Sequence, residues 1–131
     1  MMDFTPDNVV TRQAIVELAS RIETTFDRGE HMSFGAETLL FESPHMGSFY
    51  AHETYRAGLR RFYDDLKNKG GTRHLMTNYE FDALGDGEAR VRSYLTVLNR
   101  KSEQIAGVGE WRDVVRRTAA GWRFAERRQI V

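Results

Sequence analysis

Apolar side chains recur at helical spacing in two stretches of the chain. In the first stretch they follow at steps of three or four residues, at Ile15, Leu18, Ile22 and Phe26. Such spacing lines one face of a helix and predicts a helix over about residues 7–28, ended by Gly29. The second stretch repeats the pattern at Tyr55, Leu59, Phe62 and Leu66. It predicts a second helix, which the pair Gly70-Gly71 ends.

Residues 30–50, between the two predicted helices, have no sustained period. Their apolar side chains are scattered, and Ser43-Pro44 and Gly47-Ser48 are typical of turns. We expect a short helix, a short strand and a loop in this segment.

After Gly71 the pattern changes to the alternation of β-strands. The predicted strands cover residues 72–82, 88–99, 104–118 and 121–131. One face of the second strand carries small and apolar side chains, at Ala89, Val91, Ser93, Leu95 and Val97. Short connections join consecutive strands, so we expect them to pair antiparallel.

Two helices followed by a run of long strands predict an α+β fold. A strand of about eleven residues spans ~35 Å, whereas a compact domain of this size has a radius of gyration of about 14 Å. A sheet of such strands twists and should curl around the helices. We therefore expect one domain over residues 1–131, with a cone-shaped, curled antiparallel sheet packed on the N-terminal helices and enclosing a pocket.

The composition narrows the classes of function. The 131 residues carry 19 Lys and Arg against 19 Asp and Glu, a balance without the basic excess of nucleic-acid-binding domains. Without cysteine there are no disulfides and no thiol nucleophile. No apolar run approaches the ~20 residues that span a bilayer, and no basic segment with a following apolar run opens the chain. We expect a cytoplasmic protein that binds neither nucleic acid nor membranes.

His74 and Asp27 are the candidate catalytic pair. His74 lies inside the first predicted strand, whereas the roles of the other three histidines, at positions 31, 45 and 52, stay open. A strand histidine commonly packs with one hydrogen bond, and a general base needs a carboxylate to hold its second nitrogen. Asp27 lies at the edge of the apolar stripe, at a helix C-terminus where a negative charge is unfavourable. It is equally consistent with an ordinary turn-forming aspartate near Gly29.

Other chemistries have little support in the motifs. No HxH, HxxxH or HExxH spacing occurs, nor a glycine-rich nucleotide-binding motif or a serine elbow. We therefore expect no metal and no cofactor. The arginines of the last two strands are typical of the solvent-facing side of a sheet, although one inward arginine could stabilise an anion.

Six segments, taken in their order, resemble the SnoaL-like branch of the nuclear transport factor 2-like superfamily, which includes scytalone dehydratase and ketosteroid isomerase-type enzymes. They are AIVEL at 14–18, FDRGE at 26–30, TRHLMTN at 72–78, GDGEA at 85–89, WRD at 111–113 and GWRFAER at 121–127. The resemblance covers about residues 14–128. Each motif is weak alone, and together they are specific to the fold rather than to one activity.

The resemblance implies a site. Dehydratases and a dehydrochlorinase of this superfamily use an aspartate on the first helix and a histidine on the first long strand, which Asp27 and His74 match. Arg127, five residues after Trp122, takes the place of an active-site arginine. Ile22 stands where the dehydrochlorinase has a lysine, so neither its substrate nor its leaving group transfers to this chain.

Our hypothesis is a cofactor-independent lyase or isomerase that acts on a hydrophobic, cyclic small molecule. His74, held by Asp27, removes a proton from carbon, and Asn78, Arg127 or a tyrosine stabilises the oxyanion or departing group. The expected substrate-binding side chains, for most of which an ordinary place in the core is the alternative, are Phe26, Phe62, Met76, Asn78, Val91, Leu95, Val97 and Trp111. The alternative function is a non-catalytic binding module or a dimerising accessory protein with the same pocket.

The resemblance also implies a homodimer that is formed through the outer face of the sheet. Alternation along the strands assigns three aromatic side chains to that face, Tyr79, Phe81 and Tyr94.

Overall fold

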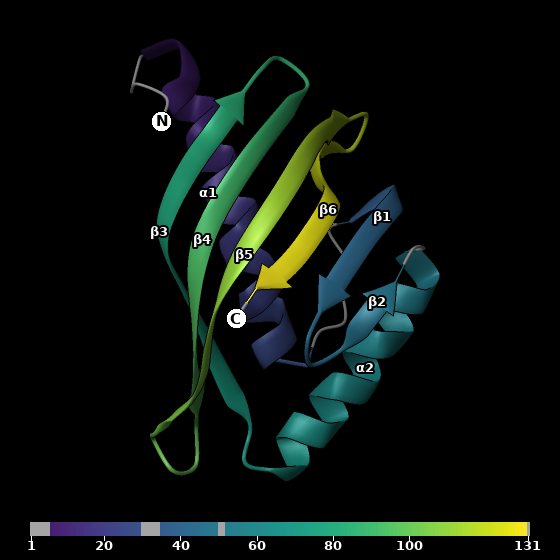
Figure 1. Cartoon of the computed structure of the whole chain (residues 1–131), viewed down its shortest axis with the longest axis vertical. Helices are drawn as coiled ribbons and strands as arrows, with labels where there is room; N and C mark the ends of the chain where they lie inside the picture. Colours follow the sequence, from purple (N-terminus) through teal and green to yellow (C-terminus); the bar gives the residue numbers. More distant parts are fainter. Residues whose placement is uncertain (1–5, 30–34, 50–51, 131) are drawn as a thin grey trace.

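The computed structural model describes residues 6–29, 35–49 and 52–130. This part of the chain forms two helices, α1 (Pro6–Asp27) and α2 (His52–Asn68), and a six-stranded sheet. The strands are β1 (Gly35–Ser43), β2 (Gly47–Phe49), β3 (Thr72–Leu84), β4 (Glu88–Asn99), β5 (Ile105–Thr118) and β6 (Gly121–Ile130). Their order across the sheet is β2-β1-β6-β5-β4-β3. Figure 1 shows the long strands β3, β4 and β5 curling through an open sheet, with α2 beside the short strands β1 and β2.

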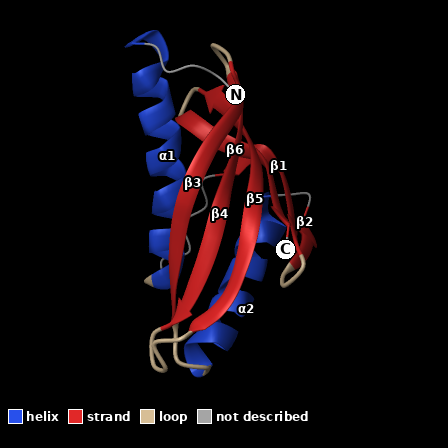
Figure 2. Cartoon of the chain, turned by 60° about the vertical axis from the view of Figure 1, so that its left-hand side comes forward, coloured by secondary structure: helices blue, strands red, loops and turns tan. Residues whose placement is uncertain are grey.

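Both predicted helices are present. The apolar stripe of α1 is buried, with Ile15 fully covered and Phe26 7% exposed, and α1 runs along the sheet (Figure 2). The helix ends where Gly29 turns into the left-handed region at φ 76°, a conformation that glycine adopts without a steric penalty. Within the described ranges, no helix is both long and apolar enough to cross a membrane.

The long strands pair antiparallel, as their short connections predict. β4 lies between β3 and β5, and β5 lies between β4 and β6. On β4 the predicted face is the buried one, from Ala89 (0% exposed) through Val91 (2%) to Leu95 (3%). That face packs against the helices and forms the core together with the buried side of β5.

The segment before α2 differs from the prediction. Residues 35–49 contain β1 and β2 instead of a short helix with one strand, and β1 pairs parallel with β6. The rest of the predicted segment, residues 30–34 and 50, lies outside the described part of the chain. β1 lies inside the sheet between β2 and β6, so its partners rather than a local period determine its conformation.

A bulge in β3 corrects the predicted outer face. Asn78 has a positive φ of 57° in the register shift between Thr77 and Glu80. An extra residue in a strand reverses the alternation beyond it. Phe81 therefore turns inward to the core (4% exposed), and the hydroxyl of Tyr79 lies 3.1 Å from Ser20 Oγ of α1. Of the three aromatic residues assigned to the outer face, Tyr94 alone is exposed, at 54%.

Candidate active site

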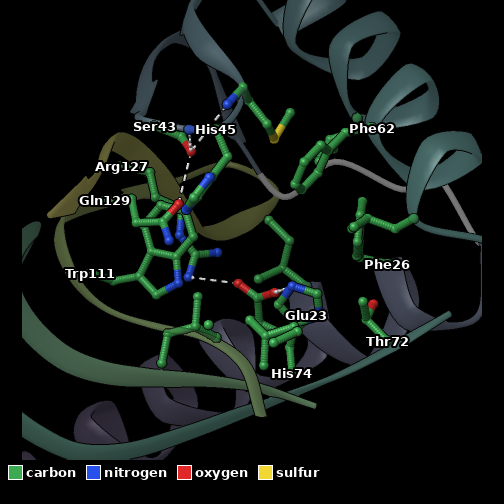
Figure 3. A pocket seen from close by; sticks show the side chains of 18 of the residues that line it. Glu23, Phe26, Ser43, His45, Phe62, Thr72, His74, Trp111, Arg127 and Gln129 are labelled. Carbon is green, nitrogen blue, oxygen red and sulfur yellow. Dashed lines mark hydrogen bonds and ion pairs between the residues drawn. The ribbon is translucent and has the colours of Figure 1, made fainter. Parts of the chain in front are cut away.

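A cavity of about 270 Å³ lies between the C-terminal end of α1, the inner side of α2 and the curled sheet. Its walls are mainly apolar, with Phe26 on α1, Phe62 on α2 and Leu95 on β4 among the side chains that line it. Its polar side chains converge from α1, β1, β3 and β6, as Figure 3 shows for Glu23, Ser43, His74, Arg127 and Gln129. An apolar cavity with a few convergent polar groups is typical of a small-molecule site.

Asp27 holds His74 by both its oxygens. Oδ1 accepts a hydrogen bond from His74 Nδ1 at 2.6 Å and another from Thr72 Oγ1 at 3.1 Å. Oδ2 accepts the backbone N–H of His74 at 2.7 Å. This N–H is available because β3 is an edge strand of the sheet. The last residue of α1 thereby fixes both the backbone and the ring of His74.

The hydrogen bond to Asp27 determines the chemistry of the imidazole. Because the carboxylate can only accept, Nδ1 carries the hydrogen and Nε2 is left for the cavity. The ring of Phe26 stands edge-on to the imidazole with centroids 5.2 Å apart. Burial disfavours the charged imidazolium, but the hydrogen bond to Asp27 and the charges of Glu23 and Asp27 outweigh it, so the pKa of His74 is raised above 6.5.

Facing His74 is a buried cluster of three charged side chains. Nη2 of Arg127 lies 3.2 Å from Glu23 Oε1, and Nε of Arg127 lies 3.4 Å from Asp113 Oδ1. The guanidinium is 4.1 Å from the centroid of the Trp111 ring and 4.6 Å from that of Phe124, as in cation–π contacts. Arg127 is 1% exposed, so the cluster is shielded from solvent.

Burial shifts the ionisation of this cluster. It raises the pKa of Asp113 to about 7, although the nearby Arg127 lowers it in part. Neither oxygen of Asp113 makes an aligned hydrogen bond within the described residues, so the guanidinium compensates its charge incompletely. Burial also raises the pKa of Tyr55 on α2, which keeps the hydroxyl of this cavity residue protonated.

A second polar group lies at the β1 side of the cavity. Ser43 Oγ donates to Gln129 Oε1 at 2.8 Å and accepts the backbone N–H of His45 at 3.2 Å. These contacts fix the turn between β1 and β2, and the exposed side chain of His45 lines the cavity beside it.

The structure brings most of the predicted site residues together. His74, Arg127 and five of the expected binding residues line the cavity, namely Phe26, Phe62, Leu95, Val97 and Trp111. Asp27 stands behind His74 rather than in the wall. Asn78 is exposed on the β3 bulge, Met76 packs half-buried against the core, and Val91 is buried in the core, so these three do not line the cavity. His31 lies outside the described residues, as does the side chain of His52 at the start of α2.

Sequence reasoning missed Glu23 and Asp113. Glu23 lies four residues after Ala19 and eight after Ile15, on the buried side of α1. Asp113 lies two residues after Trp111 on the buried side of β5. A carboxylate at a position that the period assigns to the core was the signal that could have found both.

Residues 7–128 match the SnoaL-like domain family. Among curated proteins, none matches this chain. In the described ranges, no three His, Asp or Glu side chains are grouped as a metal site requires.

Solved structures share the fold. A protein of unknown function with a cystatin-like fold from Nostoc punctiforme has a TM-score of 0.77 and 24% identity, over 98% of this chain and 93% of that one. A provisionally named scytalone dehydratase from Novosphingobium aromaticivorans has a TM-score of 0.79 and 20% identity, over 96% and 87%. ActVI-ORFA from Streptomyces coelicolor has a TM-score of 0.68 and 19% identity, over 88% and 92%. At sequence identities this low, the similarity to these structures establishes the shared fold alone.

Proposed function

The chain belongs to the SnoaL-like family, and we propose that it is a cofactor-independent lyase or isomerase for a small, hydrophobic, cyclic substrate. The family fold fits reactions of the isomerase and dehydratase type. The specific assignment depends on one observation, the 2.6 Å hydrogen bond between Asp27 Oδ1 and His74 Nδ1 in the wall of a mainly apolar cavity.

That hydrogen bond makes His74 a general acid and base. Neutral His74 presents the lone pair of Nε2, which removes a proton from a carbon next to a carbonyl group. Asp27 stabilises the imidazolium that forms, and the raised pKa of His74 expresses that stabilisation.

The electrons of the broken C–H bond then have two courses. In an elimination they form a C=C bond, the neighbouring C–O bond breaks, and His74 returns its proton to the departing oxygen, so that water leaves. In an isomerisation His74 returns the proton to another carbon of the same substrate. Either course restores neutral His74 and needs no other reactant.

Arg127 supports this chemistry through its charge. Its guanidinium is buried at the polar end of the cavity, where the low dielectric strengthens its attraction for a developing oxyanion. The apolar walls exclude water from the same space.

The test uses 3-hydroxycyclohexanone and larger cyclic β-hydroxy ketones in D₂O, followed by NMR and mass spectrometry. Deuterium exchange next to the carbonyl, or formation of the enone with loss of water, is the expected result for the wild type. His74→Ala and Asp27→Asn should each reduce the rate by at least ~100-fold, the usual contribution of general acid–base catalysis. Asp64→Asn on the exposed face of α2 is the matched control for Asp27→Asn.

Two results would contradict the proposal. Folded His74→Ala protein with the full rate would remove His74 from the mechanism. Recovery of bound but unchanged ketone from the wild type, without exchange across the panel, would favour the alternative of a binding module.

A further inference from the structure

Glu23 has one carboxylate oxygen, Oε2, that accepts no hydrogen bond within the described part of the chain. It lies on α1 one turn before Asp27, and its side chain is 8% exposed in the wall of the cavity. Oε1 lies 3.2 Å from Arg127 Nη2, in an ion pair with the guanidinium. Oε2 accepts no hydrogen bond from any described residue and lies 4.0 Å from His74 Nε2.

The gap between these two atoms has the size for one shared oxygen. A separation of 4.0 Å is too long for a direct hydrogen bond. An oxygen at about 2.8 Å from both atoms, an ordinary hydrogen-bond distance, fits between them with an angle of about 90° at that oxygen. In Figure 3 Glu23 and His74 lie side by side at the same end of the cavity.

Glu23 and His74 require different properties of the group that they both contact, namely a hydrogen-bond donor for Glu23 and an acceptor for His74. An ionised carboxylate only accepts hydrogen bonds, so the group must bring a hydrogen for Glu23. His74 in its protonated form donates from Nε2, so the group must also have a lone pair. A hydroxyl meets both demands. An ether or a halide has no hydrogen, and an ammonium group has no lone pair.

We propose that Glu23 and His74 together bind a hydroxyl group of the substrate, and that Glu23 thereby selects alcohols for elimination. This inference rests on the proposed function and narrows it to dehydration. Glu23 accepts the hydrogen of the hydroxyl, which turns an oxygen lone pair toward His74. His74 first takes a proton from the neighbouring carbon and then donates it to this oxygen. The C–O bond breaks, its electron pair leaves with the oxygen, and water departs.

Glu23 also disfavours the elimination of a halide. A departing halide would gain negative charge beside the carboxylate and be repelled in a cavity of low dielectric. A purely structural role, in which Glu23 only neutralises Arg127, uses Oε1 and gives no reason for Oε2 to discriminate between ligands. The preference for alcohols therefore distinguishes the two roles.

The experiment compares the binding of 3-hydroxycyclohexanone with that of its 3-methoxy and 3-chloro analogues. Binding is measured by ligand-observed NMR at about pH 6, below the ordinary pKa of histidine, where His74 is mainly protonated. The wild type should prefer the alcohol by about 10- to 100-fold, the contribution of one hydrogen bond to a charged group. Absence of binding by the alcohol, or equal binding of alcohol and ether, overturns the inference.

Glu23→Gln tests the residue itself. Arg127 should hold the amide oxygen, which turns the amide NH₂ toward His74 and replaces the acceptor by a donor. The preference for the alcohol should then be lost, whereas Glu17→Gln on the exposed side of the same helix should keep it. A folded Glu23→Gln protein with an unchanged preference overturns the inference.

The wild-type comparison stands even where the Glu23→Gln protein fails to fold. It also separates this inference from the proposed function, because binding is read without turnover. An alcohol preference in a protein that never releases water contradicts the proposed function but supports the role of Glu23. Release of water without any alcohol preference supports the proposed function but contradicts the role of Glu23.

Discussion

Asp113 should make the stability of the fold depend on pH in an unusual direction. Burial raises the pKa of Asp113 from 3.8 to about 7. Between these two values the folded chain keeps a proton on Asp113 that the unfolded chain has released. The free energy of unfolding therefore falls as the pH rises from about 4 to about 7, and this contribution is constant above that range.

The magnitude follows from the displacement of the pKa. At about 1.4 kcal/mol for each pH unit, the range from 3.8 to about 7 corresponds to about 4 kcal/mol of unfolding free energy. Asp113→Asn stays neutral at every pH and should lose this dependence. Because Glu23 still pairs with Arg127, the substitution does not leave the guanidinium without a counter-charge. For a chain of this length, the melting temperatures of the wild type and Asp113→Asn should differ by about 10–15 °C above about pH 7.

The assay is thermal unfolding of the wild type and Asp113→Asn at about pH 4, 6 and 8, followed by circular dichroism. The two proteins should unfold at similar temperatures at the lowest pH, and the variant should be the more stable at the highest. His74 contributes with the same sign in both proteins, because its raised pKa stabilises the fold below about 6.5 and the contribution is lost as the pH rises through the folded-state pKa. A stability difference that is constant over this range would refute the reasoning.

Two further predictions concern the C-terminal end of α1. Asp27→Asn should lower the pKa of His74, because the hydrogen bond and the charge of Asp27 are lost while the burial remains; an NMR titration of the imidazole measures this, and an unchanged pKa contradicts it. Gly29→Ala should destabilise the fold by more than ~1 kcal/mol in urea unfolding, because φ is +76° and the added Cβ would lie 2.7 Å from the Tyr63 ring. Gly87→Ala, where nothing lies within 4 Å of the added atom, is the control and should change stability little.

The helices and the long strands could be predicted because each buries one continuous face. The spacing of the apolar residues on that face can be read from the sequence, as it can from Ile15 to Phe26 on α1. β1 could not be predicted in this way, because its apolar side chains pack against segments far along the chain. The ring of Phe41 lies 4.5 Å from that of Tyr55 on α2 and 5.7 Å from that of Trp111 on β5.

The alternation of strands fails where a bulge interrupts it. Asn78 was expected on the same face of β3 as His74, and Tyr79 was expected on the opposite, outer face. The positive φ at Asn78 reverses this assignment, so that Asn78 faces outward and Tyr79 faces α1. Nothing in the alternation itself marks where an extra residue enters a strand. A non-glycine residue of the type that tolerates the left-handed region, here an asparagine, was the available signal.

The pairing of Asp27 with His74 was predicted from the family pattern, since the residues alone were equally consistent with a turn-forming aspartate. The charged cluster opposite was not predicted, because periodicity can place Glu23 and Asp113 on buried faces but cannot show that both converge on Arg127. Arg127 stands on β6 and its partners stand on α1 and β5. Their contact depends on how the sheet curls.

The buried cluster of Glu23, Asp113 and Arg127 lowers the stability of the fold, and the same burial makes its charges useful for chemistry. Buried ion pairs are often no more stabilising than apolar side chains of the same volume, and Asp113 is ionised only at the expense of the folded state. The same exclusion of water strengthens the field that Arg127 and Glu23 exert on a ligand in the cavity. Stability and function should therefore respond oppositely to Asp113→Asn above about pH 7. The variant gains stability there, whereas its Arg127 loses the carboxylate 3.4 Å from Nε and with it part of the constraint that presents Glu23 to His74.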